Sequence, residues 1–192
     1  MQNLKVLELP STLTSVGRDI TYDWNWSSQV YVVFPDGLST DSWNANWLSE
    51  NAQVVQGSTA EWVIHDAVEY LVIGNEANVL GYVTSPSVTT DLVIPSHVTA
   101  SGGQVTVTSI ASQAFRDENY IQSVFVPSTI ERIEARAFEN AWRVEEFVFE
   151  ADSQLNEIGR SAFWGVDQIE QLTLPEGLTT IGDQAFGYMR GL

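Results

Sequence analysis

Cysteine is absent from this 192-residue chain, so disulfides and zinc–thiolate sites are excluded. Because cysteine-free chains fit both the cytosol and a bacterial cell surface, this absence leaves the redox compartment undecided. The chain also lacks a run of about 18 apolar residues, the length that a membrane-spanning helix needs. Residues 1–10 have no basic region followed by an apolar core. We therefore expect no membrane insertion, secretion signal or anchor within this segment.

Basic residues are scarce. Eight Lys and Arg stand against 25 Asp and Glu, which gives a net charge of −17. The eight are Lys5, Arg18 and residues from Arg116 onward, so the stretch 19–115 has no positive side chain. Binding to nucleic acid or to an anionic membrane surface requires a basic face and is excluded. The sequence leaves open whether the acidic stretch only keeps the chain soluble or also binds cations or a basic partner.

Catalytic and metal-binding patterns are missing as well. The two histidines, His65 and His97, have no Ser/Asp partner arrangement and form no His-Glu-x-x-His motif. Asp36-Gly37 with Asp41 is the nearest approach to a calcium loop, but it lacks the alternating acids of an EF-hand. No glycine-rich phosphate loop is present, and no two of the 25 acids can be singled out as an acid/base pair. We predict a non-enzymatic chain without cofactor or metal.

What the chain does contain is an internal repeat. The dipeptide Ala-Phe recurs with its phenylalanines at Phe115, Phe138, Phe163 and Phe186, at intervals of 23, 25 and 23 residues. Two extra residues around 150–154 explain the longer interval. Alignment on these phenylalanines brings further apolar positions into register: Ile121, Val144, Ile169 and Leu192; Val124, Phe147 and Leu172; Val126, Phe149 and Leu174; Ile130, Leu155 and Leu178; Ile133, Ile158 and Ile181. This register is typical of a leucine-rich repeat.

The spacing within one copy predicts a coil made of a strand and a return. Val124 and Val126 are two residues apart and therefore point to one face of a strand. Pro127 ends that strand, because proline cannot donate to a ladder. The apolar residues that follow, up to Phe138, line the inside of the returning side. Because one coil cannot cover its own core, successive coils must stack. Unrelated β-hairpins, the alternative, would impose no such register.

The pattern resembles the BspA-type leucine-rich repeat of surface proteins, Leu-x-x-Val-x-Ile-Pro-x-x-Val-x-x-Ile-Gly-x-x-Ala-Phe. Here it reads Ile-Glu-Gln-Leu-Thr-Leu-Pro-Glu-Gly-Leu-Thr-Thr-Ile-Gly-Asp-Gln-Ala-Phe over residues 169–186. The departures are Glu150 where proline is expected and Glu134 where glycine is expected. The resemblance implies a right-handed leucine-rich-repeat solenoid, mostly β with few short helices. Each coil of about 23 residues then has one strand and a short helical or irregular turn. It also implies an extracellular or cell-surface location.

The first residues of the chain carry the same frame. One repeat is fitted by Leu4, Leu7, Leu9, Pro10, Leu13, Val16 and Gly17, after which residues 18–28 have no Ala-Phe. Residues 30–55 resemble the closing module of such arrays, in which a strand is followed by a tryptophan-bearing helical turn and a short last strand. Its tryptophans would cover an open core, or alternatively form an aromatic sugar-binding platform. They are Trp24, Trp26, Trp43 and Trp47.

Three segments follow from these patterns. Residues 1–57 are predicted to be the last repeat and C-terminal cap of a first array. Residues 58–98 are predicted to be a linker and the N-terminal cap of a second array, with a hairpin signalled by residues 74–76 between two apolar runs. Residues 99–192 are predicted to be repeats truncated mid-repeat at Leu192. We therefore expect the chain to be a segment of a longer protein.

Strand residues between the inward positions should face outward, on the concave side. Two rows are predicted there, one of Val93, Phe125, Val148 and Thr173, and one of Ser123, Glu146 and Gln171. The apolar stripe beside an acidic and amide row either reflects β-propensity or cover by the neighbouring hairpin, or forms a partner-binding surface.

We predict a non-catalytic, extracellular protein-binding or adhesion scaffold. The resemblance implies a protein partner from a host, a matrix or a neighbouring cell surface, without identifying it. The alternative is a structural spacer or stalk in a larger surface protein that carries its active domain elsewhere.

Overall fold

The computed structural model describes residues 6–8, 30–34, 52–56 and 60–192. The chain divides into two compact units, Met1–Ala60 and Glu61–Leu192. The first unit contains a parallel sheet of three strands, β1 (Val6–Glu8), β2 (Val30–Phe34) and β3 (Ala52–Gln56), in the order β1-β2-β3. The strands predicted at both ends of the closing module are therefore formed. The four tryptophans of that module lie outside the described residues.

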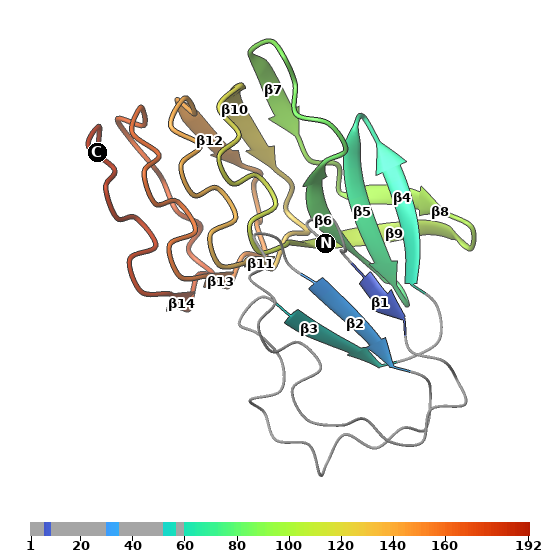
Figure 1. Ribbon diagram of the computed structural model, residues 1–192. Helices are drawn as coiled ribbons and strands as arrows, with labels where there is room; N and C mark the ends of the chain where they lie inside the picture. The colour runs from blue at the N-terminus through green and yellow to red at the C-terminus, as the bar shows by residue number, and fades with distance from the viewer. Residues whose placement is uncertain (1–5, 9–29, 35–51, 57–59) are drawn as a thin grey trace. The chain divides into compact units, whose positions relative to one another are not determined.

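Strands of the second unit recur once per coil along one side of the repeats. They are β7 (Thr90–Val93), β10 (Ile121–Val126) and β12 (Glu146–Phe149), which form a parallel sheet in the order β12-β10-β7. Figure 1 shows them along the upper side of the coils. Val124 pairs with Leu92 on one side and with Phe147 on the other. Aligned positions of successive copies therefore lie side by side, as the repeat predicted.

A second parallel ladder runs along the returning side of the coils. Its strands are β9 (Gly103–Ile110), β11 (Arg132–Ile133), β13 (Glu157–Ile158) and β14 (Thr180–Ile181). They continue into an eight-stranded sheet in the order β14-β13-β11-β9-β6-β5-β4, with β8 paired to β9. The last residues of the four ladder strands, Ile110, Ile133, Ile158 and Ile181, share one register. The isoleucine that closes each coil thus lies beside its counterpart in the next.

The predicted hairpin is formed ahead of the first coil. β5 (Val68–Ile73) and β6 (Glu76–Tyr82) are antiparallel. In the turn that joins them, Gly74 has a φ of 63°, which glycine adopts without steric cost. β4 (Ala60–His65) lies next to β5, and β8 (His97–Ala100) forms a second antiparallel pair with β9. Tyr70 and Val79 are buried in the same cluster as the coil residues, so the hairpin shares the core of the repeats.

The third side of each coil is a turn. The expectation of short helices is wrong for the described residues, among which no helix occurs. Two residues before and two residues after each phenylalanine the backbone is left-handed, at Gln113 and Asp117, Arg136 and Asn140, Ser161 and Gly165, and Gln184 and Tyr188. A right-handed helix cannot pass through such residues. The amides bond to the next coil instead: Phe115 N donates to Ala137 O and Phe138 N to Ala162 O, both at 2.8 Å.

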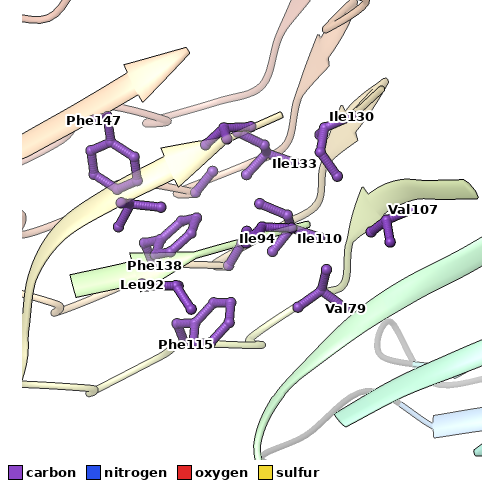
Figure 2. Close-up of a cluster of buried hydrophobic side chains, with 14 of the residues drawn as sticks. Val79, Leu92, Ile94, Val107, Ile110, Phe115, Ile130, Ile133, Phe138 and Phe147 are labelled. Carbon is purple, nitrogen blue, oxygen red and sulfur yellow. The ribbon is translucent and has the colours of Figure 1, made fainter. Parts of the chain in front are cut away.

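The core lies between these three sides. The inward positions predicted in the first full copy, Ile121, Val124, Val126, Ile130, Ile133 and Phe138, are all 0% exposed. Figure 2 shows the aromatic rings of Phe115, Phe138 and Phe147 on one side of the cluster and aliphatic residues such as Ile130 and Ile133 on the other. Each such side chain contributes about 1.5–3 kcal/mol through burial. Burial by neighbouring coils therefore holds the stack together.

Candidate functional site

The outward face of β7, β10 and β12 is made by simple alternation. In β10, Val124 and Val126 point into the core, so Ser123 and Phe125 between them point outward. The same alternation in β12 buries Phe147 and exposes the residues on either side of it. In β7 it buries Leu92 and exposes both of its neighbours. The inward packing therefore determines which six side chains this face presents.

Three of these side chains form an apolar row, defined as Val93, Phe125 and Val148. Phe125 pairs directly with Val93 on one neighbouring strand and with Val148 on the other. Val93 is 62% exposed and Val148 is 40% exposed, whereas Phe125 between them is half-buried. The predicted placement of Phe125 and Val148 as neighbours on adjacent strands agrees with this register. Neighbouring strands lie about 4.8 Å apart, so the row is a continuous strip across the sheet.

The other three side chains form an acidic row, defined as Asp91, Ser123 and Glu146. Ser123 pairs with both acids, and its hydroxyl donates to Asp91 Oδ1 at 2.7 Å. Asp91 was not among the predicted site residues. It lies two positions before Val93, so the alternation that selected the other residues contained the signal for it.

Gln171 and Thr173 do not extend these rows as predicted. Both are exposed, but no strand forms between residues 169 and 175, and the sheet has three strands instead of four. The segment belongs to the last described coil, and the structure describes a neighbouring coil on one side of it. Leu172 and Leu174 are accordingly only half-buried, and Ile181 is 53% exposed. With less apolar burial to hold it, the segment forms no ladder with β12.

Acidic side chains also flank the two rows. Gln122, the extra residue where the pairing of β10 with β7 shifts, donates to Glu145 Oε2 at 3.2 Å. Glu150 stands where the repeat has proline, and its carboxylate accepts a hydrogen bond from Ser128 N at 2.7 Å. This bond, together with one from the Ser128 side chain, lowers the pKa of Glu150 from its ordinary value of 4.5. The carboxylate therefore links one coil to the next in place of a rigid proline.

The two histidines lie beside neighbours in the chain. His65 Nε2 lies 3.4 Å from Asp66 Oδ2 at the end of β4, and His97 Nδ1 lies 3.1 Å from the hydroxyl of its neighbour Ser96. Over residues 60–192 and the three described strands before them, no three His, Cys, Asp or Glu side chains gather closely enough to hold a metal ion. The calcium-like stretch 36–41 lies outside the described residues.

The described part of the chain also contains no helix with the length and apolar character needed to cross a membrane.

Comparison with known proteins identifies the repeats. The family model described as the BspA type leucine-rich repeat region matches residues 93–192 with six copies. No curated protein is similar enough in sequence to match.

Three solved structures share the fold. A leucine-rich cell surface protein from Faecalibacterium prausnitzii A2-165 superposes with a TM-score of 0.60 and 21% identity, over 68% of this chain and 35% of its own. A leucine-rich repeat protein from Bacteroides capillosus ATCC 29799 gives 0.61 and 24%, over 68% of this chain and 94% of its own. The pneumococcal vaccine antigen PcpA gives 0.50 and 22%, over 66% and 41%. This chain thus spans about a third of the Faecalibacterium protein and nearly all of the Bacteroides protein.

Proposed function

Because the chain belongs to the BspA-type leucine-rich-repeat family, we propose that it is a non-catalytic, protein-binding scaffold of the cell surface or extracellular space. Its docking surface is the outward face of β7, β10 and β12. The surface location is supported by structural relatives such as the cell surface protein from F. prausnitzii. The parallel registers of both ladders support the solenoid that the repeats predict, and its right-handedness rests on the general preference of parallel crossovers.

One observation carries the proposal: the apolar row is exposed and continuous. A single exposed valine is normal on a soluble protein. Val93, Phe125 and Val148, however, are direct neighbours on three paired strands, and both valines are at least 40% exposed. Contiguous apolar surface of this kind marks interaction sites. Other apolar side chains of the repeats, such as Trp142, are also exposed, but Val93, Phe125 and Val148 form a row across paired strands, which supports a partner that covers them together.

The proposal is tested by placing a charge in the row and, separately, in the core. Phe125→Asp should abolish capture of proteins from a panel of immobilised matrix and host-surface proteins while leaving the circular-dichroism spectrum and the melting temperature near those of the wild type. Val124→Asp should unfold the repeats, because Val124 is 0% exposed and an unpaired buried charge is very costly.

Two outcomes would overturn the proposal. If Phe125→Asp unfolds the protein, the residue belongs to the core and the outward face is not free for a partner. If Phe125→Asp folds and every interaction of the wild type persists, the sheet is not the docking surface, and the structural-spacer alternative gains.

A further inference from the structure

We infer that the partner docks through a basic amphipathic helix, a protein helix with an apolar stripe beside a stripe of Lys or Arg. The inference rests on the proposed docking function and adds the chemistry of the partner. Three features of the sheet carry it: the charge of the acidic row, the absence of basic side chains from the strands, and the spacing of the two rows.

Among the residues that the structure describes, no ion pair is made to Asp91 or Glu146 of the acidic row. None of the residues of β7, β10 and β12 is basic. Among the described residues, the ion pairs of Arg116, Arg132 and Arg136 are made with acids on the turns and on the returning side, Glu139 foremost. From the described residues, the Asp91 carboxylate accepts one hydrogen bond, from the Ser123 hydroxyl. Within the described part of the chain, the carboxylates of this row therefore have no basic side chain paired to them, and a cationic partner would supply one.

The two rows present apolar and acidic groups at fixed separation. Residues two apart on a strand lie about 7 Å apart, so the acidic row runs parallel to the apolar row at about that distance. A partner that fits both rows must present its apolar and basic groups side by side on one face. An extended segment laid across the strands would send alternate side chains to opposite faces and match only one row.

A helix laid across the strands has the required spacing. Three strands place Val93, Phe125 and Val148 over a span of about 10 Å, in steps of about 4.8 Å. Helix residues i, i+3 or i+4, and i+7 advance by about 4.5–6 Å per step and by about 10 Å in total. An apolar stripe on such a helix therefore meets all three residues of the apolar row, and Lys or Arg one position around the helix meets Asp91 and Glu146. The apolar contacts supply affinity, and the charges supply orientation and rate of encounter.

The probes are three synthetic helical peptides of about 18 residues, long enough to hold helix when bound. The first has a leucine stripe beside a lysine stripe, the second replaces the lysines by glutamate, and the third keeps the lysines but replaces the leucines by glutamine. Binding to the intact chain is measured by fluorescence anisotropy at low and at physiological salt. We expect the leucine–lysine peptide to bind and both others to bind at least tenfold more weakly. Binding of the first peptide should weaken as salt rises.

Matched variants separate the local site from the overall charge of −17. Asp91→Asn with Glu146→Gln should weaken the leucine–lysine peptide about five- to twenty-fold, the effect of two exposed ion pairs. Glu157→Gln with Asp183→Asn removes two exposed acids from β13 and the turn after β14 and should leave binding unchanged. Equal weakening by both pairs of substitutions, or no binding of the leucine–lysine peptide, would overturn the inference.

Phe125→Ser distinguishes failure of this inference from failure of the docking face. If Phe125→Ser abolishes peptide binding while the glutamate peptide binds as well as the lysine peptide, the face docks a partner but the partner is not basic. If neither Phe125→Ser nor the Asp91/Glu146 pair changes binding, the outward face itself is not the docking site.

Discussion

The phenylalanine of each Ala-Phe pair is the residue that joins one coil to the next. The ring of Phe138 is stacked on Phe115 with centroids 5.3 Å apart and on Phe163 at 5.7 Å, and Phe147 meets it edge-on at 4.9 Å. Such pairs add about 0.5–1.5 kcal/mol each beyond area burial. The preceding alanine, Ala137, is completely buried and its carbonyl accepts the amide of Phe115. A larger residue there would have no space, which explains why the pair recurs as a unit.

Truncation of a central phenylalanine should therefore be costly. Phe138→Ala and Phe163→Ala should each lower the free energy of unfolding by about 3–5 kcal/mol, measured by urea denaturation, because both rings are 0% exposed and stacked on both sides. Phe186→Ala should cost less, since Phe186 is half-buried and is stacked on one side only. A Phe138→Ala protein that melts within a degree of the wild type would contradict the packing register.

Glu150 should make the stability of the fold depend on pH, with more stability at neutral than at acidic pH. The Ser128 bonds lower the pKa of Glu150 from 4.5 in the folded state, so their contribution is fully present above the unfolded pKa and is lost as the pH falls through the folded pKa. The melting-temperature difference between wild type and Glu150→Gln should therefore be largest at neutral pH and should shrink below the ordinary glutamate range. A difference that stays constant down to pH 3 would show that Glu150 is not held by Ser128.

Which side chains are buried was predictable from the sequence wherever the repeat is regular. The inward positions from Ile121 to Phe138 are buried as the alignment indicated. The bond from Ser128 to Glu150 was not predictable, because it joins two coils at a position where Glu150 departs from the pattern. A departure in a repeat indicates where something differs but does not say which neighbour compensates for it.

At the scale of elements, the turns show why a helix was expected and is absent. Short helices were expected because the family resemblance implied them, and the left-handed positions of the turns carry almost no glycine that would have argued against a helix. Of the eight left-handed residues that flank the phenylalanines, only Gly165 is a glycine. The others adopt positive φ because each turn is fixed by hydrogen bonds to the next coil, as between Asp117 N and Glu139 O at 2.8 Å. Tertiary pairing therefore overrides local preference here.

The glycine at its expected position in the repeat pattern, Gly159 or Gly182, does not serve a left-handed turn. It allows the backbones of neighbouring coils to approach closely. A Cβ added to Gly159 would lie 2.5 Å from Ala135 N, and one added to Gly182 would lie 2.4 Å from Arg160 N. Gly159→Ala and Gly182→Ala should therefore each cost about 1–3 kcal/mol of unfolding free energy in urea, as overpacking does. Gly102→Ala is the matched control, because nothing lies within 4 Å of its added Cβ. If Gly159→Ala is as stable as Gly102→Ala, the coils are not in contact at this position.

Strand positions were well predicted except where a neighbour is missing. β10 and β12 lie where the apolar alternation placed them, and their outward residues pair as expected. The same pattern at residues 169–175 forms no strand, although Leu172 and Leu174 have the required spacing. Alternation predicts which face of a strand is buried, but formation of the ladder also depends on cover from both sides. That cover is a property of the stack and not of the segment.

At both ends of the second unit, the burial of coil residues likewise depends on cover from a neighbouring element. At the hairpin end, Tyr82 packs edge-on against Phe115 with centroids 5.4 Å apart, and Phe115 is 0% exposed. At the other end, Phe186, Met189 and Leu178 are only half-buried. The hairpin therefore supplies for the first coil the cover that each coil otherwise receives from its neighbour. Burial of Tyr82 and the nearby charge of Glu118 raise its pKa to about 12.

The net charge of −17 acts on the molecule as a whole and not through one site. A calcium site needs about six to eight oxygen ligands gathered around one ion, and the described residues contain no group of even three acidic or histidine side chains suited to a metal. The acidic side chains are spread over the surface and repel one another. Dissolved ions screen this repulsion over the Debye length, about 10 Å in 0.1 M salt, which depends on the ionic strength and not on which cation is present. We therefore predict that calcium raises the melting temperature only gradually and without saturation, much as sodium does at equal ionic strength. Calorimetric titration should show no stoichiometric binding. A single saturable site of micromolar affinity would contradict this, and loss of that site in Asp91→Asn with Glu146→Gln would place it on the acidic row.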